Sequence, residues 1–174
     1  LIITVTKAIA CGNRIGAVLE IEPEMKSGTM KWPDRMQADD SGMPAVEFDH
    51  VSLRYKGAGA DSLSGITFRA ERGQTIGIIG GTGSGKSSLV NMIPRFYDAT
   101  AGEVRICGKN IREYETEDLR SHIGMVLQKA VLFKGTIAEN IRWGKEDATD
   151  EQIREVLEIS QAQEFVETKE GGIQ

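Results

Sequence analysis

Hydrophobic and polar residues alternate in three stretches of the chain, and each stretch predicts a strand. Residues 46–55 alternate with one slip at His50, which indicates a bulge within the strand. Residues 63–70 and 103–107 show the same alternation, which is typical of strands that bury one face and expose the other. The glycine-rich stretch 56–61 between the first two predicts a loop.

Apolar residues at helical spacing occur towards both ends of the chain. Residues 1–22 carry an apolar stripe that predicts a helix, and shorter helices are predicted over 118–122 and 136–143. The sequence Thr149–Gln152 fits a capping box, and it begins a further amphipathic helix. The charged residues of this last helix predict a solvated face: Glu151, Arg154, Glu155 and Glu158.

Two further short runs predict buried strands. One is 123–126, and the other is the β-branched run 75–79. The glycine-rich stretch 80–88 follows the second run directly, and residues 88–93 read as a helix. The glycine-rich stretch is therefore expected to join a strand to a helix.

Residues 80–88 spell G-x-x-x-x-G-K-S, and a place between strand and helix is the context that a phosphate-binding loop requires. Glycines let backbone amides converge on phosphate oxygens, and the following helix N-terminus adds partial positive charge. Lys86 supplies a charge for the β- and γ-phosphates, and the Ser87 hydroxyl can ligate Mg²⁺. The chain is thus expected to bind a nucleoside triphosphate or to descend from a protein that did. The expected nucleotide-binding residues are Gly80, Gly81, Thr82, Gly83, Ser84, Gly85, Lys86, Ser87 and Ser88.

Size, charge and cysteine content narrow the class of protein. A length of 174 residues suits one domain with an appendage. The net charge of −5, the pI near 5.2 and the lack of a basic cluster argue against a nucleic-acid partner. Cys11 and Cys107 have no metal-type spacing and are expected to be reduced thiols. Residues 1–5 are too few to span a bilayer, so the 174 residues alone are expected to be soluble.

Residues 23–44 have the composition of a linker. They hold three of the four prolines of the chain together with mixed charge. Trp32 is the residue in this stretch that needs a partner surface. Both Trp32 and Trp143 are expected to be packing anchors rather than ligand contacts.

With these segments in order, the chain resembles the nucleotide-binding domain of an ABC transporter, in particular the exporter type that fuses membrane and ATPase parts. The matching segments are the strand 46–55, the Walker A loop 80–88, the Q-loop segment 126–133 and the segment 133–141 that follows it in exporters. The resemblance implies an α/β fold, a P-loop NTPase (RecA-like) core with an antiparallel β-subdomain. It also implies the following division: 1–22 as the end of the last transmembrane helix, 23–44 as linker, and 45–174 as the N-terminal portion of the ATPase domain.

The resemblance implies roles for residues outside the loop. Tyr55 stands where the family stacks an aromatic ring on adenine, and Gln128 stands where the family senses the metal or the attacking water. Lys86 and Gln128 are therefore the expected catalytic residues, and Ser87 and Gln128 the expected Mg²⁺ ligands. The implied partners are ATP, a transmembrane domain on the same or another chain, and a second nucleotide-binding domain in a homo- or heterodimer. The implied location is the cytoplasmic face of the membrane.

Several family motifs have no counterpart in the 174 residues. No apolar run ending in Asp-Glu follows Gln128, no Leu-Ser-Gly-Gly-Gln signature occurs, and neither His50 nor His122 stands at the place of the switch histidine. The domain is therefore expected to be incomplete at its C-terminal side, and the isolated chain is expected to lack ATPase activity. Two alternatives stay open: another P-loop enzyme such as a small-molecule kinase, and a non-catalytic nucleotide-dependent regulatory module.

Overall fold

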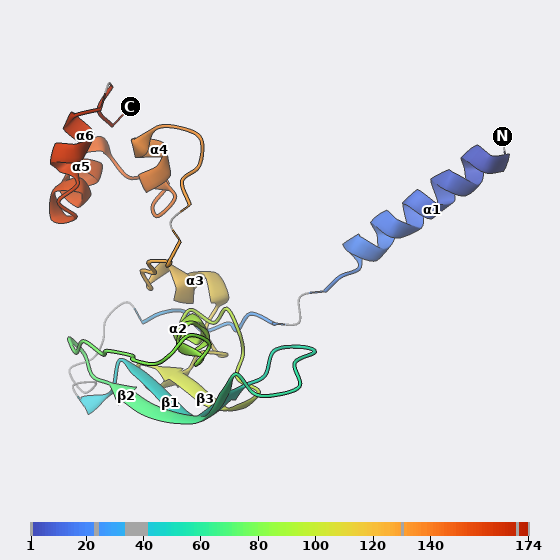
Figure 1. The fold of residues 1–174 in the computed structure, drawn as a ribbon, viewed down its shortest axis with the longest axis horizontal. Coiled ribbons are helices and arrows are strands. Elements are labelled where there is room, and N and C mark those ends of the chain that lie inside the picture. Colours follow the sequence, from blue (N-terminus) through green and yellow to red (C-terminus); the bar gives the residue numbers. More distant parts are fainter. Residues whose placement is uncertain (1, 23–24, 34–41, 130, 170, 174) are drawn as a thin grey trace. The chain divides into compact units, whose positions relative to one another are not determined.

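The computed structural model describes residues 2–22, 25–33, 42–129, 131–169 and 171–173 (Figure 1). The chain divides into two compact units, Leu1–Gly124 and Met125–Gln174. Each unit has its own cluster of buried apolar side chains.

In the described part of the first unit, a four-stranded antiparallel sheet has the strand order β2-β1-β3-β4. The predicted bulge is confirmed, because His50 has a φ of 48° and the pairing of β1 with β2 shifts register between Phe48 and Val51. The three predicted strands are confirmed, and the short β4 was not predicted. The bounds are β1 Val46–Leu53, β2 Leu63–Ala70, β3 Ala101–Ile106 and β4 Lys109–Asn110.

The core of the first unit lies between this sheet and two helices, α2 (Lys86–Met92) and α3 (Thr116–Ser121). Figure 1 shows α2 lying over one face of the sheet. Phe48 of β1 is fully buried and stacks on Phe68 of β2 with ring centroids 4.7 Å apart. The predicted helices over 88–93 and 118–122 thus exist with slightly different ends. Other buried members of the core are Val51, Leu53, Leu63, Leu89, Met92, Val104, Ile106, Ile111, Tyr114 and Leu119.

The two predicted buried strands on either side of α2 are wrong. Residues 75–79 form no ladder with any strand in the described part of the chain, and the Ile79 side chain is 97% exposed. Residues 123–126 likewise form no strand, and Val126 is 97% exposed. A β-branched run supplies strand propensity, but a strand needs a neighbouring backbone to pair with, and neither run has one among the described residues.

The N-terminal helix is confirmed as α1, Ile2–Leu19. Several of its large apolar side chains are exposed, among them Ile9, Ile15 and Leu19. Among the described helices, none combines the length and hydropathy needed to cross a bilayer.

The linker prediction covers 23–44, of which 23–24 and 34–41 lie outside the described residues. Trp32 packs on Tyr114 with centroids 5.7 Å apart and stacks on His122 at 4.7 Å, so its prediction as a packing anchor is confirmed. Met30 forms a parallel bridge with Tyr114. The described part of this stretch is therefore attached to the first unit.

The second unit consists of short helices whose starts are encoded locally. Thr136 and Thr149 each form a capping box, with Glu139 and Gln152 as the reciprocal partners, so the predicted helix starts are confirmed. A cluster of apolar residues joins the helices: Ala138, Ile153, Leu157 and Val166. The bounds are α4 Ile137–Arg142, α5 Asp150–Ile159 and α6 Gln163–Glu167, of which α6 was not predicted.

Two further sequence predictions agree with the structure, one on exposed charges and one on the cysteines. The four charged residues predicted as a solvated face of α5 are all exposed. Among the described residues, Cys11 and Cys107 form no disulfide. Trp143 contacts Phe133, with ring centroids 4.7 Å apart, yet remains 72% exposed, so it anchors the loop before α4 rather than the core of the unit.

Candidate nucleotide-binding site

The glycine-rich loop 80–88 enters α2 in a conformation that requires glycine. Gly83 and Gly85 have φ angles of 81° and 87°, in the left-handed region that other residues rarely adopt. A Cβ atom on Gly85 would lie 2.7 Å from the Ser62 carbonyl oxygen and 2.8 Å from Leu63 Cδ2. The loop therefore passes close to the start of β2, and the sheet fixes where α2 begins.

The Lys86 ammonium group lies across the loop. Its Nζ donates hydrogen bonds to the carbonyl oxygens of Gly80, at 2.7 Å, and Gly81, at 2.6 Å. It also lies 3.4 Å from Ser84 Oγ. Sequence reasoning predicted this charge at the loop, and the structure adds that two loop carbonyls hold it. An ammonium group at a glycine-rich loop can move from the loop carbonyls to the oxygens of a polyphosphate.

The remaining loop residues are accessible to a ligand. Gly81, Thr82 and Ser84 are exposed, and so is Ser87, whose hydroxyl was predicted to ligate Mg²⁺. A hydroxyl oxygen is a hard ligand of the kind that Mg²⁺ accepts, and Mg²⁺ in such sites takes its other ligands from phosphates and water. The residues present thus fit a Mg²⁺–nucleotide complex.

Tyr55 lies beside the loop. Its hydroxyl donates a 2.8 Å hydrogen bond to Ser88 Oγ, and its ring meets Tyr97 edge to face, with centroids 4.9 Å apart. Two aromatic rings and the third residue of α2 are therefore held together. Sequence reasoning selected Tyr55 by its place in the motif. It missed both Tyr97 and the contact with Ser88, because folding brings these residues from a distant part of the chain to the residues after β1.

Gln128 belongs to the other unit, Met125–Gln174, and its side chain is exposed. Its expected role toward the metal stays a prediction. In the same unit, sequence reasoning missed Asn140, which fixes the loop before α4. Its side chain accepts from the Phe133 amide at 2.8 Å and donates to the carbonyls of Phe133, at 3.0 Å, and Thr136, at 2.9 Å.

A sheet, a glycine loop that runs into a helix, and a lysine over that loop define an α/β protein of the P-loop NTPase class. The sequence model of the ABC transporter family matches residues 63–172. The chain belongs to the ABC transporter family.

Known proteins of this family resemble the chain over nearly its whole length. The uncharacterized ABC transporter ATP-binding protein YfiB of Bacillus subtilis is 41% identical over 167 residues, which are 95% of this chain and 28% of that protein. YgaD of the same organism, named for multidrug export as an ATP-binding/permease protein, is 42% identical over 163 residues, 94% of this chain and 27% of that protein. The structure of a bacterial Atm1-family ABC exporter with ATP bound superimposes with a TM-score of 0.83 and 25% identity, over 98% of this chain and 29% of that chain. The chain therefore spans little more than a quarter of the length of these relatives.

Proposed function

We propose that this chain is the ATP-binding part of an ABC exporter, and that it couples ATP binding and hydrolysis to the export of a substrate across a membrane. The observation that carries the proposal is the Lys86 ammonium, held by the carbonyls of Gly80 and Gly81 at the loop that opens α2. The named exporters among the relatives support the direction of transport. Family membership favours this function over a small-molecule kinase.

Each residue of the site has a distinct role in this proposal. The amides of loop 80–88 hold the β-phosphate and its neighbours, and Lys86 moves from the loop carbonyls to the β- and γ-phosphate oxygens. Tyr55 would stack on adenine, and Ser87 would supply a hydroxyl ligand to Mg²⁺. Gln128 keeps its predicted role toward the metal and the attacking water. Bound Mg²⁺ offsets the charge that develops on the phosphates.

The wider assembly follows from the same proposal. Residues 1–22 continue the last transmembrane helix, 23–44 lead from it, and 45–174 begin the ATPase domain. A second nucleotide-binding domain, identical or different, pairs with this one. The two domains enclose two ATP molecules at their interface, and closure of this dimer moves the membrane helices. The site then lies at the cytoplasmic face of the membrane, next to a transmembrane domain of the same or a partner chain.

The proposed recognition of a triphosphate and an adenine is tested by calorimetry on the assembled transporter. A non-hydrolysable ATP analogue with Mg²⁺ is expected to bind. AMP lacks the β- and γ-phosphates that Lys86 would contact, so it is expected to bind at least about 100-fold more weakly. Replacing Tyr55 by Ala removes a stacking surface and should lower the affinity for the analogue about 5- to 10-fold. Tyr55→Phe keeps the ring, so its affinity should stay within about threefold of the unmodified value. Equal binding of the analogue and AMP contradicts the proposal.

Hydrolysis needs a carboxylate that positions the attacking water, and within the 174 residues no apolar run ending in Asp-Glu follows Gln128. We therefore expect the 174-residue polypeptide alone to release phosphate from ATP no faster than its Lys86→Ala variant. The measurement is phosphate release from contaminant-free protein. Phosphate release faster than in the Lys86→Ala control would show that the 174 residues hydrolyse ATP by themselves, which contradicts this expectation. Nucleotide binding without turnover in the assembled transporter as well favours the non-catalytic regulatory module instead.

A further inference from the structure

A segment that the composition marks as linker is bound tightly to the first unit. Residues 26–32, which we call the strap, run beside residues 113–116. The Gly28 amide donates to the Tyr114 carbonyl at 3.0 Å, the Met30 amide to Glu113 at 2.9 Å, and the Glu115 amide to Met30 at 2.8 Å. Three backbone hydrogen bonds and an isolated parallel bridge between Met30 and Tyr114 thus attach the strap to residues 113–115.

Side chains close both ends of the strap. Ser27 Oγ accepts a 2.9 Å hydrogen bond from the Thr116 amide, at the first residue of α3. At the other end, the Trp32 amide donates to the Asp118 carboxylate. Between them, Gly28 lies so close to residues 112–113 that a Cβ would collide with the Glu113 carbonyl. The strap is therefore seated at backbone distance, which glycine alone permits.

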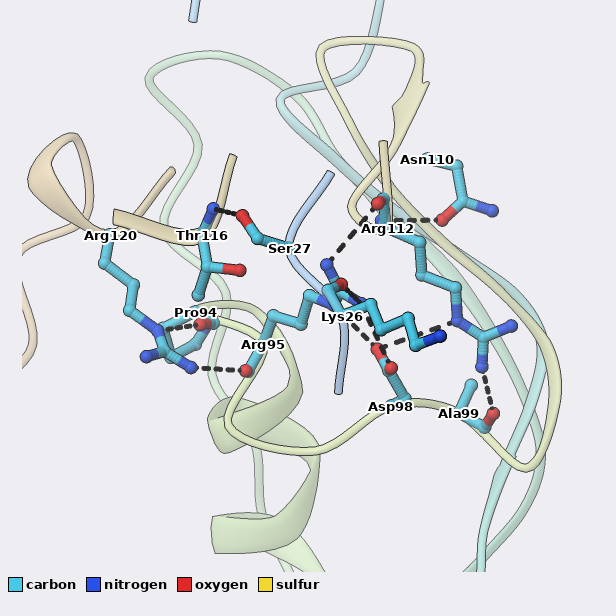
Figure 2. Close-up of polar contacts among 10 residues, drawn as sticks. All are labelled: Lys26, Ser27, Pro94, Arg95, Asp98, Ala99, Asn110, Arg112, Thr116 and Arg120. Atoms are coloured by element: carbon cyan, nitrogen blue, oxygen red, sulfur yellow. Dashed lines mark hydrogen bonds and ion pairs between the residues drawn. The ribbon is translucent and has the colours of Figure 1, made fainter. Parts of the chain in front are cut away.

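Arg95 joins the strap to the end of the phosphate-loop helix, as Figure 2 shows. Its side chain is 4% exposed, and its backbone has a φ of 53°, in the left-handed region. The guanidinium donates to the Lys26 carbonyl of the strap at 3.0 Å and to the Arg112 carbonyl at 3.4 Å. It also makes two hydrogen bonds to the Asp98 carboxylate, of 2.8 and 3.1 Å. One buried cation thus holds three separate segments.

Neighbouring charges keep this cluster fixed. Burial alone raises the pKa of Asp98, but hydrogen bonds and charges from Arg95 and Arg112 outweigh burial and hold that pKa below its ordinary value, so the carboxylate stays ionised. Arg120 donates to the carbonyls of Pro94, at 3.0 Å, and Arg95, at 2.7 Å, which fixes the backbone that carries the buried guanidinium (Figure 2).

The cluster lies on a short path along the chain. The phosphate loop ends in α2, which has seven residues, and the Arg95 amide donates to the carbonyl of Met92, the last residue of α2, at 3.0 Å. On the other side, six residues separate Lys26 from the end of α1 at Leu19. A stretch of that length reaches at most about 25 Å, so the chain tethers α1 within that distance of the strap.

We propose that the strap and the Arg95 cluster form a clasp that attaches the end of the phosphate-loop helix to the chain leading to α1, and that Arg95 is the positioning residue through which nucleotide binding displaces α1. The inference rests on the proposed nucleotide-binding function. Its partner element is α1, and it needs no contact between α1 and the nucleotide. The clasp transmits movement because hydrogen bonds of 3.0 Å join α2 to Arg95 and Arg95 to the strap, and the chain itself continues from the strap to α1.

The test uses an environment-sensitive fluorophore on the exposed Cys11 of α1, in an assembled transporter in which that cysteine is the one labelled. The probe ligand is a non-hydrolysable ATP analogue with Mg²⁺, and calorimetry measures its affinity in parallel. Arg95→Lys keeps the charge but lacks the forked donors that reach Lys26 and Asp98 together. Gly28→Ala unseats the strap without touching α2 or its loop. Arg69→Lys is the matched control, since Arg69 pairs with Glu47 on the sheet at 2.7 Å, outside the clasp.

We expect the unmodified transporter and Arg69→Lys to show a nucleotide-dependent change in Cys11 emission. Arg95→Lys and Gly28→Ala should each bind the analogue within about threefold of the unmodified affinity, yet lose at least about four fifths of the emission change. The two variants reach the clasp from opposite sides, so a folding defect in one leaves the other informative.

Three results overturn the clasp. An unmodified transporter that binds the analogue without any Cys11 response removes the path to α1 and leaves the proposed function intact. Variants that retain the emission change show that α1 moves by another route. Variants that lose affinity and emission in parallel show that Arg95 merely supports the fold. Absence of analogue binding in the unmodified transporter, by contrast, refutes the proposed function together with the clasp.

Discussion

Replacing Lys86 by alanine is expected to weaken binding of a non-hydrolysable ATP analogue with Mg²⁺ about 10- to 100-fold and to reduce ATP turnover by at least as much. The ammonium makes charged hydrogen bonds to phosphate oxygens, each worth about 1.5–3 kcal/mol, and alanine supplies none of them. In the structure the same group bridges the carbonyls of Gly80 and Gly81, so its loss also loosens the loop. Calorimetry and phosphate release on the assembled transporter measure the two effects.

The matched control for this variant is Lys109→Ala. Lys109 is an exposed lysine on β4 of the same unit, away from the phosphate loop in the sequence. It carries the same charge, so its removal tests whether net charge alone attracts the nucleotide. The affinity of Lys109→Ala for the ATP analogue is expected to stay within about twofold of the unmodified value. An unchanged affinity in Lys86→Ala, or an equal loss in both variants, contradicts the role assigned to Lys86.

Replacing Gly85 by alanine is expected to destabilise the first unit by about 2–3 kcal/mol, because the left-handed backbone at a φ of 87° costs a side chain about 1–2 kcal/mol and the Cβ collides with its neighbours. The nearest atoms are the Ser62 carbonyl oxygen at 2.7 Å and Leu63 Cδ2 at 2.8 Å. The melting temperature should fall by about 5–10 °C, and affinity for the ATP analogue at least about tenfold, because the loop must move away from the start of β2.

Gly59→Ala is the control, since a Cβ there meets no atom within 4 Å. Thermal unfolding followed by tryptophan fluorescence and calorimetry of nucleotide binding should leave this control within about 2 °C and twofold of the unmodified protein. If Gly85→Ala melts and binds like Gly59→Ala, the loop tolerates a side chain at its junction with α2. Its observed geometry would then have no bearing on nucleotide binding.

Features that depend on a few neighbouring residues were predicted correctly from the sequence. The bulge at His50 follows from one slip in the alternation of β1. The capping box at Thr149 follows from residues three positions apart, which a helix start brings within hydrogen-bonding distance. The capping box at Thr136 has the same spacing, although the sequence predicted only the helix that begins there. The loop 80–88 enters its predicted helix, although no strand forms directly before the loop in the described chain. Its proposed ligands remain predictions, as does the role of Gln128.

Features that depend on distant partners were missed or wrong. Residues 75–79 have the composition of a strand and pair with none in the described chain, because propensity does not provide a neighbouring backbone. Tyr97 has no motif of its own. It meets Tyr55 because folding brings the residues after α2 beside the residues after β1. Asn140 reads as an ordinary polar residue of a helix, yet its amide fixes the loop at Phe133.

The order of residues alone therefore specified the glycine and lysine positions of loop 80–88 and the starts of α4 and α5, because each depends on contiguous residues whose backbone preferences are local. It also specified the family, through several motifs in a fixed order along the chain. Folding in three dimensions decided that a proline-rich stretch would be fastened at residues 26–32, and that Arg95 would be buried against it. No local pattern marks those positions, since the partners of Arg95 are carbonyl groups, which every residue carries, at Lys26 and Arg112, and a carboxylate at Asp98. A buried guanidinium becomes favourable once all of these acceptors converge on it, and only the tertiary structure brings them together.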